Sequence, residues 1–125
     1  MNATAGLRVP VVLFLAGTLI MALGLDVGSS SPATVVVPDN FPTIQEAVDA
    51  AQAGDTVFVR NGVYKERQLT VRKSLALVAE SNGTVIDGEG NWVNVYFQSV
   101  EGGALEGFSI TNGYGIYLHN CLIFW

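Results

Sequence analysis

The chain has 125 residues, enough for one domain, and half of them are hydrophobic while 14% are charged. This composition excludes an intrinsically disordered chain, which would be more polar and more highly charged. Eleven acidic residues against six basic ones give a net charge of −5. We therefore expect no nucleic-acid partner, because binding to phosphates needs clustered Lys and Arg side chains.

The N-terminal segment has the pattern of an export signal. Residues 9–25 (VPVVLFLAGTLIMALGL) are uncharged, Arg8 precedes them, and Asp26 and a Gly/Ser/Pro patch follow. This is the order of a secretory signal peptide, although the run also reaches the lower length limit of a membrane-spanning helix. We assign residues 1–28 to a signal peptide, with an uncleaved N-terminal membrane anchor as the alternative. The predicted location is secreted, periplasmic or cell-surface, with membrane contact only through this segment.

A linker over residues 29–34 leads into the folded part, residues 35–125. It begins with a short β-branched run, TVVV (34–37), and continues with one amphipathic helix. Thr43 and Glu46 have the spacing of a capping box, and Gly54 stands where a C′ glycine would end a helix. The residues that we assign to this helix and its ends are Thr43, Ile44, Glu46, Ala47, Val48, Ala51 and Gly54.

Short apolar runs separated by turn residues follow Gly54, and their β-branched and aromatic content predicts strands. They cover residues 56–59, 69–71, 75–79, 84–87, 94–97, 105–110 and 115–118. Val57, Leu77, Phe97 and Leu118 recur at intervals of about 20 residues, and Val85 and Leu105 repeat on a second track. This period predicts an all-β parallel β-helix, and it fits a leucine-rich horseshoe or a β-sandwich less well.

A solenoid of this kind exposes an unpaired edge and an open apolar core at each end. We expect the helix to cover the N-terminal end, with its apolar residues turned inward. The C-terminal end would be open, so that further coils would follow it in a longer repeat protein. End-to-end self-association at the last coil is the corresponding prediction for a partner.

The string FPTIQEAVDAAQAGDTVFVRNGVYKE resembles the opening of right-handed parallel β-helix proteins of the pectate-lyase-like superfamily. It is similar to the start of pectin methylesterases, whereas GFSITNGYGIYLHNC looks more like the repeats of the NosD-type and archaeal branch. The resemblance covers residues 35 to 118 and implies a right-handed β-helix, of which this chain is the N-terminal part. The catalytic motifs of the esterases do not occur in the sequence, so the resemblance implies a module without catalytic residues.

Metal chemistry has one candidate. Asp87, Glu89 and Asn91 alternate in DGEGN and could offer oxygen ligands to Ca²⁺, but the intervening glycines equally suit a tight corner. His119 and Cys121 alone do not make a metal site. We therefore predict no cofactor, with calcium as the only candidate.

Four aromatic residues, Trp92, Tyr96, Tyr114 and Tyr117, could stack against sugars. Strand alternation places Tyr96 and Tyr117 opposite their apolar neighbours, outside the core, where they would form a ladder at the coil spacing. The predicted function is an exported, non-catalytic β-helix module that is structural or binds extracellular polysaccharide or other cell-envelope components. The alternative is a fragment of a carbohydrate-active enzyme, similar to a pectin methylesterase or a polysaccharide lyase, without its catalytic coils.

Overall fold

The structure is a computed structural model that describes residues 31–122. The predicted signal peptide or anchor (1–28) therefore lies outside the described residues, as do the first linker residues and residues 123–125. Within the described part, no helix is long and apolar enough to cross a membrane.

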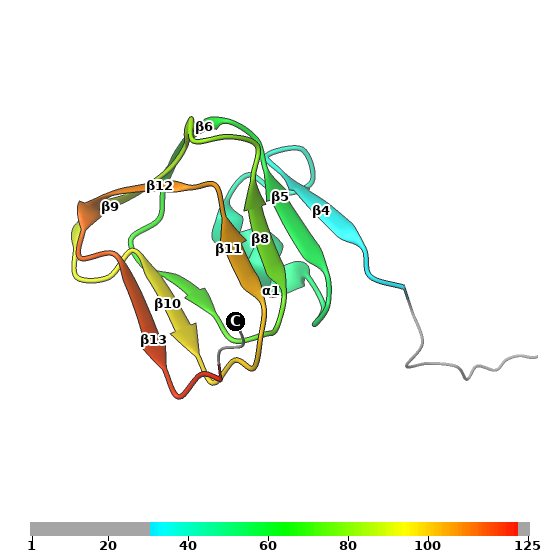
Figure 1. Ribbon diagram of the computed structural model, residues 1–125. Coiled ribbons are helices and arrows are strands. Elements are labelled where there is room, and N and C mark those ends of the chain that lie inside the picture. Colours follow the sequence, from blue (N-terminus) through cyan, green and yellow to red (C-terminus); the bar gives the residue numbers. More distant parts are fainter. Residues whose placement is uncertain (1–30, 123–125) are drawn as a thin grey trace, which may run out of the picture. The chain divides into compact units, whose positions relative to one another are not determined.

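The described chain consists of short strands and one short helix (Figure 1). In chain order the elements are β4 (Thr34–Val37), α1 (Ile44–Ala50), β5 (Thr56–Val59), β6 (Gly62–Lys65), β7 (Leu69–Val71), β8 (Ala76–Ala79), β9 (Thr84–Asn91), β10 (Val95–Gln98), β11 (Ala104–Glu106), β12 (Ser109–Gly113) and β13 (Ile116–His119).

The strands form three parallel sheets, with the orders β11-β8-β5-β4, β12-β9-β6 and β13-β10-β7. The chain visits the three sheets in turn, so each coil adds one strand to each sheet, and Figure 1 shows the sheets as sides of a ring. This confirms the predicted all-β solenoid with a short helix on its N-terminal side.

The register departs from the predicted spacing. Val57 stacks on Leu77 as predicted, but Leu77 then stacks on Leu105, 28 residues later, and not on Phe97. The predicted match of Val85 with Leu105 is also wrong, because Val85 pairs with Ser109. The coil that follows Leu77 contains the eight-residue strand β9, so the coil length changes and a fixed period of about 20 residues fails.

Two element boundaries also differ from the prediction. Strand β6 was missed because Asn61 and Gly62 have the composition of a turn, yet the structure begins the strand at Gly62. The predicted strand over residues 105–110 is two strands, β11 and β12, separated at Gly107. Gly107 has a φ of 81°, and a Cβ there would lie 3.2 Å from the Cβ of Ala79. The chain turns the corner of the solenoid at this glycine.

The core runs along the inside of the coils. On β5, β8 and β10 the side chains alternate between buried and partly exposed, and the buried residues of β5 stack on those of β8 in the next coil. Eight strand residues of the core are fully buried: Val37, Val57, Val59, Leu69, Val71, Leu77, Ile86 and Val95. Burial of apolar side chains is the main stabilising contribution for such short strands.

Helix α1 packs against the first coil. Its residues Ile44, Ala47 and Val48 and the following residue Ala51 are buried and belong to the same apolar cluster as the inward strand residues. The helix contacts β4, β5 and β7. At its start, the hydroxyl of Thr43 accepts a hydrogen bond of 3.1 Å from the amide of Glu46. The structure therefore places the predicted helix residues against the first coil.

The end of α1 differs from the prediction for Gly54. The helix ends at Ala50 and Ala51 is extended, so Gly54 is too far along the chain to be its C′ residue. The Lys73 ammonium group instead donates to the carbonyl oxygens of Val48 and Asp49 at 2.9 and 2.7 Å, and also to that of Ala51. A cation that follows β7 in the first coil thus satisfies the carbonyl groups that an αL glycine would otherwise help to satisfy. Gly54, with a φ of 95°, belongs to the turn before β5.

Candidate functional site

Two pairs of aromatic rings lie on the outside of the last two coils. The first pair, Trp92 and Tyr114, lies in the turns that precede β10 and β13. The ring centroids are 6.3 Å apart and the planes are tilted by 42°. A hydrogen bond of 3.0 Å from the amide of Tyr114 to the carbonyl oxygen of Trp92 holds the two turns together. Trp92 is 75% exposed and Tyr114 is 81% exposed, so both rings present broad apolar surface to solvent.

The second pair, Tyr96 and Tyr117, lies on β10 and β13 at directly paired positions. The centroids are 5.5 Å apart and the planes differ by 27°, so the rings stack. The ring of His119 lies 6.4 Å from that of Tyr96. Because the stacked tyrosines cover part of each other's faces, they offer less free ring surface than Trp92 and Tyr114 do.

Polar side chains border this second pair on the same sheet. Gln98 is the partner of His119 in the register of β10 and β13, and its side-chain oxygen accepts a hydrogen bond of 2.8 Å from Arg72 Nε. Thr70 is the partner of Tyr96 on β7. The outer face of this sheet therefore combines aromatic rings with hydrogen-bonding groups.

The acidic corner DGEGN does not gather its oxygen atoms at one point. Asp87 Oδ1 accepts hydrogen bonds of 2.9 Å from the amide of Glu89 and from Asn112 Nδ2, and these bonds lower the pKa of the Asp87 carboxyl. Glu89 contacts Arg67 Nε at 3.4 Å, and the Asn91 amide group donates to the Arg67 carbonyl. Among the residues that the structure describes, no group of three or more His, Cys, Asp or Glu is arranged to hold a metal ion.

Glu66 has a raised pKa, but its contacts point to a structural role. Burial raises the pKa of Glu66, as it does for many catalytic acids. Its Oε1 atom, however, accepts hydrogen bonds from the backbone amides of Ile44 and Gln45 at the start of α1. Glu66 therefore accepts hydrogen bonds from the free backbone amides at the start of α1, and its position does not suggest a general acid.

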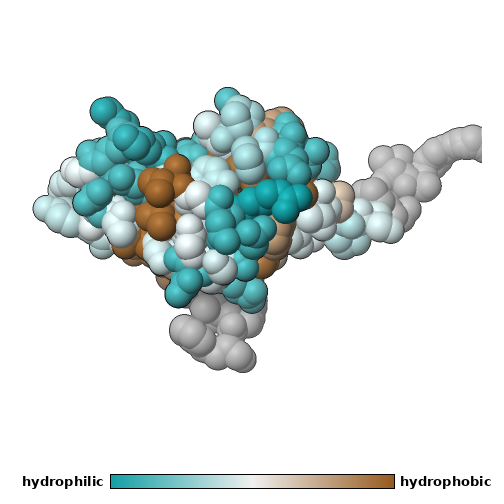
Figure 2. Space-filling model, turned by 90° about the horizontal axis from the view of Figure 1, so that it is seen from above, coloured by the Kyte–Doolittle hydropathy of each residue, from teal (hydrophilic) through white to brown (hydrophobic). Residues whose placement is uncertain are grey.

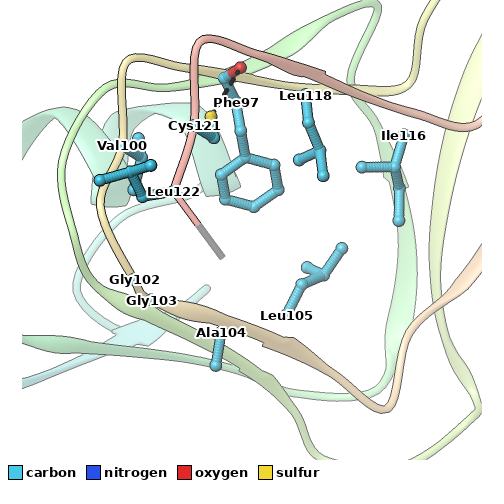
Figure 3. A pocket seen from close by; sticks show the side chains of 10 residues that line it. All are labelled: Phe97, Val100, Gly102, Gly103, Ala104, Leu105, Ile116, Leu118, Cys121 and Leu122. Carbon is cyan, nitrogen blue, oxygen red and sulfur yellow. Dashed lines mark hydrogen bonds between the residues drawn. The ribbon is translucent and has the colours of Figure 1, made fainter. Parts of the chain in front are cut away.

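The C-terminal end of the solenoid contains an apolar pocket of about 540 Å³ (Figure 3). Figure 3 shows Phe97, Leu105 and Leu118 directed into the space between the strands. Cys121, a free cysteine, lies on the same wall as Phe97. None of the lining residues is charged: Phe97, Val100, Gly102, Gly103, Ala104, Leu105, Ile116, Leu118, Cys121 and Leu122.

The outer surface elsewhere is more polar. Figure 2, seen from the side on which β6 lies in Figure 1, shows a largely hydrophilic face with a few hydrophobic patches. Val63, on β6, is an exposed hydrophobic residue at 63%.

Sequence reasoning missed the buried polar residue Asn94, because it lies at the start of an apolar run. Its side chain is fully buried, donates to the carbonyl of Thr111 at 2.6 Å and accepts from the amide of Gly115 at 3.0 Å. Asn94 therefore joins the corner before β10 to the next coil, next to the exposed rings of Trp92 and Tyr114. The available signal in the sequence was an Asn shortly after the Gly-rich segment DGEGN, because Asn side chains often bond to nearby backbone groups in turns.

No protein-family model matches the chain, and neither the curated proteins nor the solved structures that were compared with it give a match. The geometry of the described residues is therefore the basis for the functional proposal.

Proposed function

We propose that the protein is an exported, non-catalytic β-helix module that binds neutral polysaccharide through the exposed rings of Trp92 and Tyr114. The observation that carries the proposal is that these two rings are 75% and 81% exposed yet held 6.3 Å apart by adjoining coils. Two tilted apolar rings on a rigid solenoid can contact neighbouring sugar units, and binding does not require the entropy loss of ordering a loop. Export rests on the signal-like pattern of residues 1–28.

The second pair extends the proposed surface along the same two coils. Tyr96 and Tyr117 present ring edges and hydroxyl groups. Gln98 lies on β10 of the same sheet, Arg72 directly follows β7, and both side chains can donate hydrogen bonds. Sugar rings offer apolar faces and polar edges, so this mixture suits them. A net charge of −5 disfavours strongly anionic polymers, which is why the proposed ligand is neutral.

Affinity electrophoresis in gels that contain hydroxyethyl cellulose or xyloglucan tests the proposal, with polygalacturonate as the anionic comparison. The wild-type chain should be retarded by a neutral polymer. Trp92→Ala and Tyr114→Ala should each raise the apparent Kd about tenfold, which is about 1.4 kcal/mol.

Val63→Ala is the matched control, because Val63 is also an exposed apolar residue but belongs to β6 in another sheet. It should leave the retardation unchanged. If the wild type migrates freely in both neutral gels, or if Trp92→Ala and Tyr114→Ala are retarded as strongly as the wild type, the proposal is wrong.

A further inference from the structure

The exposed rings of Trp92 and Tyr114 do not lie in one plane. Their planes are tilted by 42° at a centroid distance of 6.3 Å. An aromatic ring makes its largest contact with a sugar ring when the two planes are parallel, because the apolar faces then meet. The two aromatic rings can therefore contact two sugar rings at once only if those sugar rings are tilted relative to each other as well.

Backbone hydrogen bonds hold the two turns from which these rings project. The amide of Tyr114 donates to the carbonyl oxygen of Trp92 at 3.0 Å, so the turns lie side by side. The buried side chain of Asn94 donates to the carbonyl oxygen of Thr111 and accepts from the amide of Gly115. These two bonds lie on either side of Tyr114 in the chain, and they fix the backbone that carries its ring.

The space beside the two rings is free. Gly90 precedes Trp92 by two residues and Gly115 directly follows Tyr114. A Cβ at either glycine would meet no atom within 4 Å outside the adjoining residues, so the described part of the chain leaves room there for a long ligand. The rings belong to successive coils, since their turns precede the paired strands β10 and β13. A polysaccharide chain that contacts both rings therefore crosses from one coil to the next.

The second aromatic pair does not provide a flat platform either. Tyr96 and Tyr117 stack on each other with their centroids 5.5 Å apart. Because their faces turn toward each other, they offer edges and hydroxyl groups to a ligand and not two free faces in one plane. Neither pair therefore matches a flat array of sugar rings.

We propose that the Trp92 and Tyr114 pair binds single, twisted chains of neutral polysaccharide in preference to the flat surface of crystalline polysaccharide. At a crystal surface the sugar rings of a chain lie close to one plane, so only one of the two aromatic rings could lie flat on it. In a free chain the glycosidic bonds rotate, and consecutive sugar rings can adopt the tilt that both aromatic rings require. The preference rests on the proposed polysaccharide binding and names the physical form of its ligand.

Adsorption of the full chain to two forms of cellulose tests the preference. Microcrystalline cellulose and amorphous, acid-swollen cellulose consist of the same polymer and differ in its order. Since the loss of one ring contact should raise Kd about tenfold, the wild type should bind amorphous cellulose about tenfold more tightly than microcrystalline cellulose. Adsorption isotherms give Kd and capacity separately, so the different surface areas of the two forms do not affect the comparison.

The ring variants provide a second measurement. On amorphous cellulose, Trp92→Ala and Tyr114→Ala should each raise Kd about tenfold, whereas on microcrystalline cellulose only one of them should, because one ring alone can lie flat. Val63→Ala, at an exposed residue of β6, is the matched control and should leave both isotherms unchanged. The variant without both rings keeps the apolar segment of residues 9–25 and should lose the binding, which excludes adsorption through that segment. Circular dichroism checks that each variant keeps its β-structure.

The outcomes separate this preference from polysaccharide binding itself. If the neutral gels retard the wild type but it does not bind amorphous cellulose more tightly than microcrystalline cellulose, the preference is wrong and the polysaccharide function stands. Equal losses from both single variants on microcrystalline cellulose would also overturn the preference, because both rings would then contact the flat surface. If the wild type migrates freely in the neutral gels and binds neither form of cellulose, the polysaccharide function is wrong and the preference fails with it.

Discussion

The Glu66 carboxylate lies at the N-terminus of α1 and accepts a hydrogen bond of 2.7 Å from the backbone amide of Ile44. The same oxygen atom accepts from the amide of Gln45 at 3.2 Å. Lys73 binds the carbonyl groups at the other end of the helix. A helix of seven residues is too short to be stable alone, so the first coil holds α1 by both of its ends.

Replacing Glu66 with Ala should destabilise the protein. The buried amide of Ile44 and the partly buried amide of Gln45 would lose their acceptor, and a buried donor left unsatisfied costs about 1–3 kcal/mol. Urea unfolding followed by circular dichroism measures the loss, and Glu66→Gln, which keeps an acceptor oxygen, should lose less. Glu106→Ala, at an exposed acid of β11, is the control and should change the unfolding free energy by less than about 0.5 kcal/mol. Equal stability of Glu66→Ala and the wild type would contradict this role.

The sequence was sufficient to predict the class of fold and the helix on its N-terminal side, because both depend on local patterns. The alternation of apolar residues identifies short strands, and the Thr43 to Glu46 spacing marks the helix start. Tyr96 and Tyr117 could be placed in one ladder because the coil between them has no insertion. The stacked rings lie at paired positions of β10 and β13.

The register and the polar contacts depend on the number of residues in each coil, and local sequence patterns do not reveal this number. The step from Val57 to Leu77 is 20 residues, but the next step in the same sheet, to Leu105, is 28. The partners of α1 could not be predicted for the same reason. Glu66 meets Ile44 across 22 residues, and Lys73 meets Val48 across 25.

Asp55 makes the stability depend on pH. Hydrogen bonds from the amides of Ala33 and Gln52 lower the pKa of its carboxyl below the ordinary value of 3.8. A lowered folded-state pKa means that the stabilisation is present above pH 3.8 and is lost as the pH falls through the folded-state pKa. Asp55→Asn should therefore have a lower Tm than the wild type at pH 7, and the difference should shrink as the pH falls below 3.8. A difference that stays constant down to pH 2 would show that ionised Asp55 is not the cause.

Gly113 lies at the end of β12, against the buried side chain of Asn94, and this position has no room for a side chain. A Cβ there would lie 2.2 Å from Asn94 Oδ1, so Gly113→Ala would displace the buried Asn94 and its bonds to Thr111 and Gly115. We expect a loss of about 1–3 kcal/mol in urea unfolding. Gly83→Ala is the matched control, because its Cβ would meet only ordinary contacts at 3.4 Å or more. If both alanine variants unfold at the same urea concentration, the corner is less tightly packed than the structure shows.

The role of α1 as a cover for the first coil leads to the last prediction. Val48 is 1% exposed and belongs to the apolar cluster of the first coil. Val48→Asp would place a carboxylate inside that apolar cluster, away from solvent, which is costly for a charged group. We expect the helix to separate from the coil, which exposes the strand edges and the apolar core beneath it.

Static light scattering at increasing protein concentration measures the outcome, because exposed strand edges promote aggregation. Ala50→Asp is the control, since Ala50 lies on the exposed side of the same helix and receives the same charge. It should remain as soluble as the wild type, whereas Val48→Asp should aggregate. If Val48→Asp keeps its solubility and its β-type circular dichroism, the first coil does not need the helix as a cover.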